Sequence, residues 1–175
     1  MNTKSERFAA TGQSRPEFAI EPGPGQESVW DYPRPPAIVR DGRQVEVYDG
    51  KSLLARSKAA YKVMETASPP TFYIPAADVD FDLLVPLTET TYCEWKGTAS
   101  YFALAHKPLE PVGWCYERPR PRFECIKGHL AFYPGRVDCR LDGEQATTQP
   151  GRFYGGWITS EVVGPFKGEP GTGHW

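Results

Sequence analysis

The sequence predicts a single, mainly β domain, built as a small twisted barrel or a two-layer β-sheet with one short helix. The chain holds 18 prolines and 17 glycines among 175 residues. They separate short runs of β-branched and aromatic residues, a pattern typical of short strands joined by tight turns. No segment repeats with a period of about 20–50 residues. Strand-like runs do not alternate with helical ones, so a βαβ architecture is not indicated.

The composition divides the chain into an arm, a domain and an extension. Residues 1–28 are polar and rich in Gly and Pro, which predicts a flexible N-terminal arm. Residues 29–175 form the β-rich domain. Within it, residues 151–175 are Gly-rich but carry five aromatic side chains. A disordered tail seldom holds so many, so this segment is expected to be a C-terminal extension packed on the domain.

The first strands are predicted by alternation and by turn chemistry. Residues 43–48 alternate polar with apolar side chains, and Asp49-Gly50 follows as a hairpin turn because glycine tolerates positive φ. Residues 52–57 are the returning strand. Two further turns of this type are predicted at Asp41-Gly42 and Asp142-Gly143.

The middle of the chain contains one ambiguous segment and a series of strands. Residues 58–68 fit either a short helix or a turn followed by a strand over 61–66. Residues 76–84, with acids near their start, predict the short helix. Strands are expected over residues 71–74, 99–105, 112–116, 130–133 and 137–141. The last of these is expected to pair back on 130–133 across Pro134-Gly135.

Charge and cysteine usage restrict the partners and the compartment. A net charge of −2 provides no field that would attract nucleic acid or an anionic membrane, and no apolar run reaches the roughly 20 residues of a membrane span. The first residues lack the apolar region of a secretory signal, which predicts a cytoplasmic protein. Without a CxxC pair, the four cysteines are expected to be free thiols. The expected partner is a small molecule, and the oligomeric state stays open.

Residues 91–101, TYCEWKGTASY, are the most informative segment. Cys93 stands three residues before Lys96, and an ammonium beside a thiol favours the nucleophilic thiolate. Lys96 could instead bind a phosphate or carboxylate, with Gly97 allowing close approach of the backbone. The same pattern also fits a buried structural cysteine beside a surface lysine, since no histidine is placed nearby in sequence to act as a base.

Glu65 is a second candidate because it stands in an apolar stretch, VMET, just before PPTFYIP. A carboxylate in apolar surroundings can act as an acid or base. It could equally form an ion pair with Lys96 or Arg56 and stabilise the fold. The candidate catalytic residues are therefore Cys93, Lys96 and Glu65.

Aromatic side chains in or near predicted strands are the third group. Such rings can stack on a base or a sugar, although packing in the core explains them equally well. The candidate ligand-binding residues are Lys96, Gly97, Tyr73, Trp114, Tyr116 and Tyr133. No phosphate-binding loop and no zinc-ligand spacing occurs, so no metal site is predicted and the cofactor stays open.

Several ordered motifs carry a resemblance to a known family. They are VWDYPRPP, VEVYDGKSLLARS, METASPPTFYIP, TYCEWKGTASYF, GWCYERP and LAFYP. Together they resemble the domain of unknown function 427 over roughly residues 29–175. The resemblance implies a small, mainly β domain that is filed near nucleotidyltransferases without a defined reaction. The motif residues it places in this chain are Glu65, Tyr73, Pro75, Cys93, Lys96, Gly97, Trp114 and Tyr133.

The chain departs from the family pattern at one point. Many members have Cys-Pro-Tyr-Lys-Gly where this chain has Cys93-Glu94-Trp95-Lys96-Gly97. The thiol and the amine are retained, but the added acid Glu94 opposes activation of Cys93 by the neighbouring amine.

Three functions are compatible with these residues. The first is a module that binds a small anionic ligand, a nucleotide or a sugar phosphate, through Lys96 and the aromatic set. The second is an enzyme in which Cys93 or Glu65 does covalent or acid–base chemistry, nucleotidyltransferase-like by family filing alone. The third is a scaffold that binds another protein through the aromatic C-terminal segment.

Overall fold

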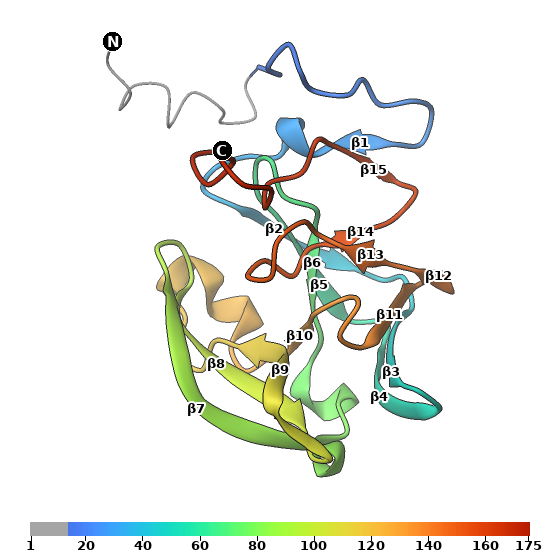
Figure 1. The fold of residues 1–175 in the computed structure, drawn as a ribbon, viewed down its shortest axis with the longest axis vertical. Helices are drawn as coiled ribbons and strands as arrows, with labels where there is room; N and C mark the ends of the chain where they lie inside the picture. Colours follow the sequence, from blue (N-terminus) through green and yellow to red (C-terminus); the bar gives the residue numbers. More distant parts are fainter. Residues whose placement is uncertain (1–13) are drawn as a thin grey trace.

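The computed structural model describes residues 14–175, which form a mainly β domain of several small sheets (Figure 1). The predicted fold class is confirmed. In the described residues the sheets do not close into a barrel. One four-stranded antiparallel sheet has the order β10-β9-β8-β7. Its strands are β7 (Leu84–Cys93), β8 (Gly97–Leu104), β9 (Lys107–Cys115) and β10 (Ala131–Phe132).

The remaining strands form two further sheets and two short pairs. A four-stranded sheet joins β12 (Glu144–Gln145), β11 (Asp138–Leu141), β3 (Val45–Asp49) and β4 (Ser52–Ser57). A three-stranded sheet joins β2 (Ala37–Asp41), β5 (Ala60–Met64) and β6 (Thr71–Tyr73). The pairs are β1 (Glu27–Ser28) with β15 (Val162–Val163), and β13 (Thr147–Thr148) with β14 (Trp157–Ile158).

Helical structure in the described residues consists of 3-10 segments. They are η2 (Val29–Asp31), η3 (Ala76–Asp78), η4 (Phe81–Leu83) and η5 (Pro121–Ile126). The short helix predicted over 76–84 is therefore divided into two single turns. Asp80 separates them because its carboxylate accepts the main-chain N–H of Asp82 at 3.0 Å, which caps the second turn.

The hairpin predictions have mixed outcomes. The β3–β4 hairpin is confirmed, with Gly50 at a φ of 58° in its turn. A tight turn at Asp142-Gly143 joins β11 to β12, as predicted. The prediction at Asp41-Gly42 is wrong, since β2 and β3 belong to different sheets.

Two pairings depend on contacts that local sequence does not encode. The segment 58–68 forms a strand, β5, which pairs with β2 and β6. The expected pairing of 137–141 with 130–133 is wrong, because β11 pairs with β3 and β10 pairs with β9. The strand β7 is not predicted at all, since Pro86 interrupts its pattern.

The C-terminal segment is part of the hydrophobic core. Trp157 in β14 is fully buried, its ring lies 5.1 Å from that of Phe72, and its indole N–H donates to the carbonyl of Phe132 at 3.0 Å. The main-chain N–H groups of Trp157 and Lys167 donate to the carbonyls of Pro70 and Ala67, which joins the segment to the loop between β5 and β6. Burial of one such indole stabilises a fold by several kcal/mol, about 3–5 by the cost of truncation to alanine.

The N-terminal residues that the structure describes also contact the domain. β1 pairs in parallel with β15, and the ring of Phe18 lies 5.1 Å from Trp30 and 5.3 Å from Trp175. The remainder of the predicted arm, residues 1–13, lies outside the described residues.

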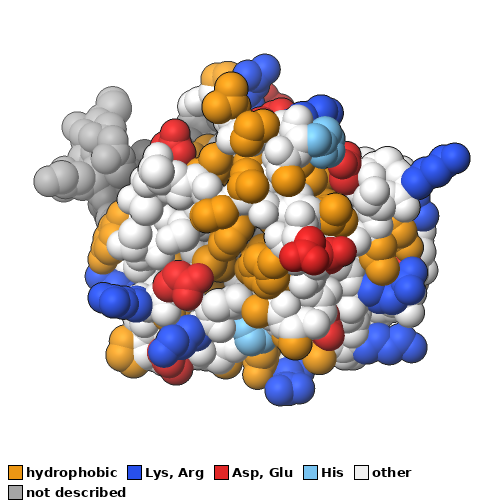
Figure 2. All heavy atoms as spheres, turned by 90° about the horizontal axis from the view of Figure 1, so that it is seen from below, with side chains coloured by type: hydrophobic (Ala, Val, Ile, Leu, Met, Phe, Trp, Pro, Cys, Tyr) orange, Lys and Arg blue, Asp and Glu red, His pale blue; other side chains and the backbone are white. Residues whose placement is uncertain are grey.

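The face seen in Figure 2 carries charges of both signs around a central group of hydrophobic side chains. Basic and acidic side chains are interspersed there, so this face has no field of a single sign. In residues 14–175, no helix combines the length and the apolar character that crossing a membrane requires.

Candidate functional site

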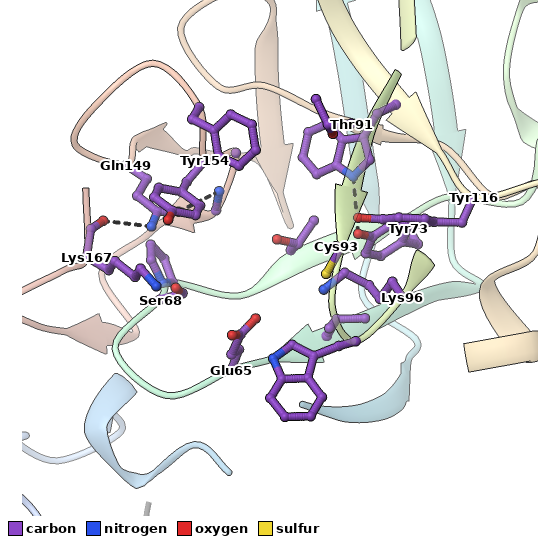
Figure 3. Close-up of a pocket in the computed structure, with 18 of the residues that line it drawn as sticks. Glu65, Ser68, Tyr73, Thr91, Cys93, Lys96, Tyr116, Gln149, Tyr154 and Lys167 are labelled. Carbon is purple, nitrogen blue, oxygen red and sulfur yellow. Dashed lines mark hydrogen bonds between the residues drawn. The ribbon is translucent and has the colours of Figure 1, made fainter. Parts of the chain in front are cut away.

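A cavity of about 360 Å³ lies between the β7–β8 turn, the loop after β5 and the C-terminal segment. Volumes of this order are typical of small-molecule sites. The predicted site residues that line it are Glu65, Tyr73, Cys93, Lys96, Trp114, Tyr116 and Tyr133. Residues separated by more than fifty positions in the sequence are thus brought together (Figure 3).

The β7–β8 turn positions the thiol and the amine. Cys93 ends β7 and pairs directly with Gly97, the first residue of β8. Gly97 has a φ of 102°, which only glycine adopts readily, and it lies against the main chain of Arg118 rather than in the cavity. The main-chain N–H of Arg120 donates to the carbonyl of Lys96 at 3.1 Å. Gly97 therefore shapes the turn, and its expected contact with a ligand is not supported by its position.

Lys96 is 8% exposed and lines the cavity. Among residues 14–175, no carboxylate lies within ion-pair distance of its ammonium and no acceptor is hydrogen-bonded to it. The Phe123 ring centroid lies 5.8 Å from its Nζ. Unlike Nε1 of Trp95, Lys96 Nζ is not fully enclosed by protein atoms, so the ammonium is open to the cavity. The cavity therefore contains an ammonium without a partner in the described residues, together with the carboxylates of Glu65 and Glu94.

Cys93 is half-buried and faces the same region as Lys96. Figure 3 shows its sulfur beside the Lys96 amine and the hydroxyls of Tyr73 and Tyr116. Burial, with smaller contributions from neighbouring groups that include Cys93, raises the pKa of both tyrosines well above the usual range. Both hydroxyls therefore keep their protons and remain hydrogen-bond donors at ordinary pH.

The other three cysteines are placed elsewhere. Cys139 is fully buried, and burial raises the pKa of its thiol. Burial and the neighbouring Glu117 raise the pKa of Cys115 to about 12. Cys125 is exposed on η5. Cys93 alone of the four lines the cavity.

Glu65 faces the cavity from the loop after β5, and its side chain is 25% exposed. The expected pairing with Lys96 or Arg56 is wrong. Arg34 is its partner, with Nε 3.7 Å from Oε1, whereas Arg56 pairs with Glu46. Arg34 is itself held by donation to the carbonyls of Thr66 and Trp175. The Glu65 carboxylate makes no hydrogen bond in the described residues, so its oxygens are free to accept from a bound molecule.

The aromatic wall is fixed by one hydrogen bond and by close packing. The indole N–H of Trp114 donates to the hydroxyl oxygen of Tyr73 at 3.2 Å, and the rings of Trp114 and Tyr133 lie 4.5 Å apart. Gly155 packs on both rings so closely that a Cβ there would lie 2.4 Å from the Trp114 ring. These aromatics pack in the core and also line the cavity, and stacking on a ligand stays a prediction.

The C-terminal segment supplies a further wall of the cavity, a role that was not predicted from the sequence. Its lining residues are Gln149, Phe153, Tyr154, Gly155, Gly156 and Lys167. Gln149 is 2% exposed and ties the segment together, accepting from Gly156 N–H at 2.9 Å and donating to the Lys167 carbonyl at 2.7 Å. The one available signal was the Gly155-Gly156 pair between aromatics, which indicates close approach of the backbone.

Lys167 brings a second ammonium to the cavity. Its Nζ donates to the main-chain oxygen of Trp175 at 3.0 Å. Burial lowers the pKa of Lys167, and the charge of Glu65 opposes this shift. Lys167 is thus partly compensated, in contrast to Lys96.

The wall also contains an indole donor without an acceptor. Trp95 lines the cavity, and its Nε1 is buried with no hydrogen-bond partner among residues 14–175. Unpaired buried donors are uncommon and costly.

The chain is thus a mainly β domain whose cavity contains a thiol, two protonated tyrosines and an ammonium that has no ion-pair partner among residues 14–175. The chain belongs to the family described as domain of unknown function (DUF427), whose family model matches residues 37–143. The inner wall of the cavity, including Cys93 and Lys96, falls within this match, and the wall after residue 143 does not. A comparison with curated proteins returned no match.

Proposed function

We propose that the cavity binds a small anionic ligand, with nucleotides and sugar phosphates as the class to examine first. The observation that carries the proposal is Lys96, a side chain 8% exposed whose ammonium is directed into the cavity and has no ion-pair or hydrogen-bond partner among the described residues. An anion at this position would pair with a charge that the cavity walls partly screen from bulk water.

Three further features support an anionic ligand. The hydroxyls of Tyr73 and Tyr116 are protonated donors beside Lys96. The wall formed by Trp114 and Tyr133 offers aromatic surface for the uncharged part of a ligand. The volume of about 360 Å³ suits a small molecule and not a protein segment.

The C-terminal segment gives less support to a scaffold function. Trp157 is fully buried and Trp175 packs against Phe18 and Trp30, so these rings are occupied within the domain. Phe153 is the exposed ring of the segment, at 59%. A protein partner would therefore find one aromatic anchor there.

The test is a thermal-shift screen of nucleoside phosphates and sugar phosphates against the wild type, Lys96→Met and Lys127→Met. Lys127 is an exposed lysine outside the cavity and serves as the matched control. A ligand at 100 times its Kd stabilises the fold by about 2.7 kcal/mol, which a melting curve resolves. We expect a shift that Lys96→Met removes and Lys127→Met retains. A shift of equal size in all three proteins, or no shift with any compound, would contradict the proposal.

A further inference from the structure

We propose that the cavity is also an active site that hydrolyses small carboxamides, with Cys93 as the acyl acceptor, Glu65 as the proton carrier and Lys96 as an oxyanion donor. The structure places these three side chains around one cavity large enough for a small substrate (Figure 3). Each contributes a different requirement of acyl transfer, namely a nucleophile, a base and a charge that stabilises the intermediate.

Cys93 is the nucleophile because it alone of the four cysteines reaches the cavity. Its thiol is half-buried, accessible to a bound molecule and shielded from the open surface. A second, independent feature of the same space is Lys96. Its side chain is 8% exposed, is directed into the cavity and has no partner in the described residues.

The donors around Cys93 match the charge that develops at a carbonyl oxygen. Tyr73 uses its oxygen as an acceptor for Trp114, which leaves its own hydrogen available. The hydroxyls of Tyr73 and Tyr116 both lie beside the Cys93 thiol. With Lys96 they can offer three donors to the oxygen of a carbonyl bound at the sulfur, an arrangement that favours an oxyanion over a neutral carbonyl.

Glu65 is the acceptor for the thiol proton. Its carboxylate points into the cavity opposite Cys93 and Lys96, and it makes no hydrogen bond in the described residues. Arg34 lies 3.7 Å from it and is anchored to two main-chain carbonyls, so Arg34 is a positioning residue that orients Glu65. The gap between thiol and carboxylate leaves room for substrate or a bridging water, and such contacts tighten when substrate binds.

The reaction balances without a cofactor or an oxidant. The Cys93 thiol gives its proton to Glu65 as sulfur forms a bond to the carbonyl carbon, and the carbonyl π electrons move to oxygen beside Lys96. The C–N bond breaks, Glu65 protonates the departing amine, and a thioester remains. Water then attacks the thioester, Glu65 accepts a proton from it, and the proton returns to sulfur as the C–S bond breaks. The products are a carboxylic acid and an amine, which exchange a proton to leave a carboxylate and an ammonium ion.

This inference rests on the proposed function in one respect, since both need Lys96 to meet a negatively charged oxygen. The two fail in different experiments. The ligand screen measures equilibrium binding of an anion, whereas acyl transfer leaves a covalent mark on Cys93. A protein that binds phosphates but never acylates would keep the first proposal and lose the second.

The test uses the full chain and two probes. The first is p-nitrophenyl acetate, whose leaving group departs without protonation, followed by release of p-nitrophenolate and by intact and peptide mass. The second is a series of primary amides from formamide to butyramide, followed by release of ammonia. We expect a burst of p-nitrophenolate, one acetyl group on Cys93, continued turnover, and ammonia from at least one amide.

The variants separate the three roles. Cys93→Ala abolishes the burst, while Cys125→Ser, which changes the exposed thiol outside the cavity, leaves it unchanged. Lys96→Met slows acetylation by about 100-fold, the effect of losing one oxyanion donor. Glu65→Gln slows removal of the acetyl group by about 100-fold, so that acetyl-Cys93 accumulates.

Three outcomes would overturn the assignment. If Cys93 were acetylated no faster than Cys125, the assignment of Cys93 as the nucleophile would be wrong. If the wild type never hydrolysed the Cys93 adduct, the assignment of Glu65 as the base that activates water would be wrong. If the protein turned over the ester but released no ammonia from any amide, carboxamides would be excluded as the substrate class.

Discussion

Lys62 and Lys96 are both buried lysines, 5% and 8% exposed, but they differ in their partners. Lys62 Nζ donates to Glu27 at 3.0 Å, whereas Lys96 has no such acceptor among residues 14–175. Lys62 is thus paired within the fold, whereas the ammonium of Lys96 remains available to pair with a bound molecule. This contrast allows the role of Lys96 to be tested without knowledge of the ligand.

We expect Lys62→Met to lower stability and Lys96→Met to leave it nearly unchanged. Loss of Lys62 leaves Glu27 without its partner and lowers the free energy of unfolding by about 1 kcal/mol, a modest value because Glu27 is half exposed. Loss of Lys96 breaks no ion pair or hydrogen bond among residues 14–175, and its Nζ is open to the cavity, so the free energy of unfolding should change by less than about 0.5 kcal/mol. Urea denaturation of both variants measures the difference. Equal destabilisation would show that Lys96 has a stabilising partner in solution.

Tyr73→Phe should destabilise the domain because the indole N–H of Trp114 would lose its acceptor in the interior. An unsatisfied buried donor costs about 1–3 kcal/mol. Tyr92→Phe is the matched control, since the Tyr92 hydroxyl also accepts a hydrogen bond, from Arg120, but the side chain is 64% exposed. Its substitution should change the free energy of unfolding by less than about 0.5 kcal/mol. If both variants lost the same stability, the hydrogen bond to Trp114 would not be the cause.

Gly155→Ala should disturb the aromatic wall from the side of the C-terminal segment. The added methyl group would lie 2.4 Å from the Trp114 ring and 2.9 Å from Tyr133, so one of them must move. Overpacking of this kind costs about 1–3 kcal/mol. Gly42→Ala is the control, because no atom lies within 4 Å of the added carbon and the backbone does not need glycine there. Chemical denaturation and ligand shift together would measure the effect, and unchanged values for Gly155→Ala would mean that this wall is mobile in solution.

Asp41 should contribute to the acid sensitivity of the fold. Burial raises the pKa of Asp41, but hydrogen bonds from the side chain and main chain of Arg43 outweigh it and hold the pKa below the usual value. The native state therefore binds a proton less readily than the unfolded chain. The resulting stabilisation is complete above the unfolded pKa of about 3.9 and is lost as the pH falls through the lower native value. Asp41→Asn should show a shallower loss of stability below about pH 4, and slopes equal to wild type would exclude this carboxylate.

The elements that could be predicted are those specified by residues close together in the sequence. The β3–β4 hairpin follows from alternation around Asp49-Gly50, and both features are contained within 15 residues. The strand β7 was missed because Pro86 and a polar run hide its pattern, although pairing with β8 stabilises it. The partner of β11 is β3, some ninety residues away, and nothing near residue 138 indicates it.

The candidate site shows the same division. Cys93 and Lys96 stand out because their spacing is local, and Glu65 stands out because it interrupts an apolar run. Arg34 and Lys167 were not foreseen, since in sequence each resembles a charge in a Pro- or Gly-rich loop. Their relation to Glu65 exists only after the chain has folded, when long-range packing brings residue 167 to the cavity.

The placement of the tryptophans makes the cavity optically accessible. Of the five indoles, Trp95 and Trp114 line the cavity, while Trp30, Trp157 and Trp175 lie in other clusters. A molecule that enters will change the polarity and hydrogen bonding around the first two and leave the other three unaffected. Intrinsic emission, quenched or shifted on titration, can therefore report occupancy of this site in the unlabelled protein.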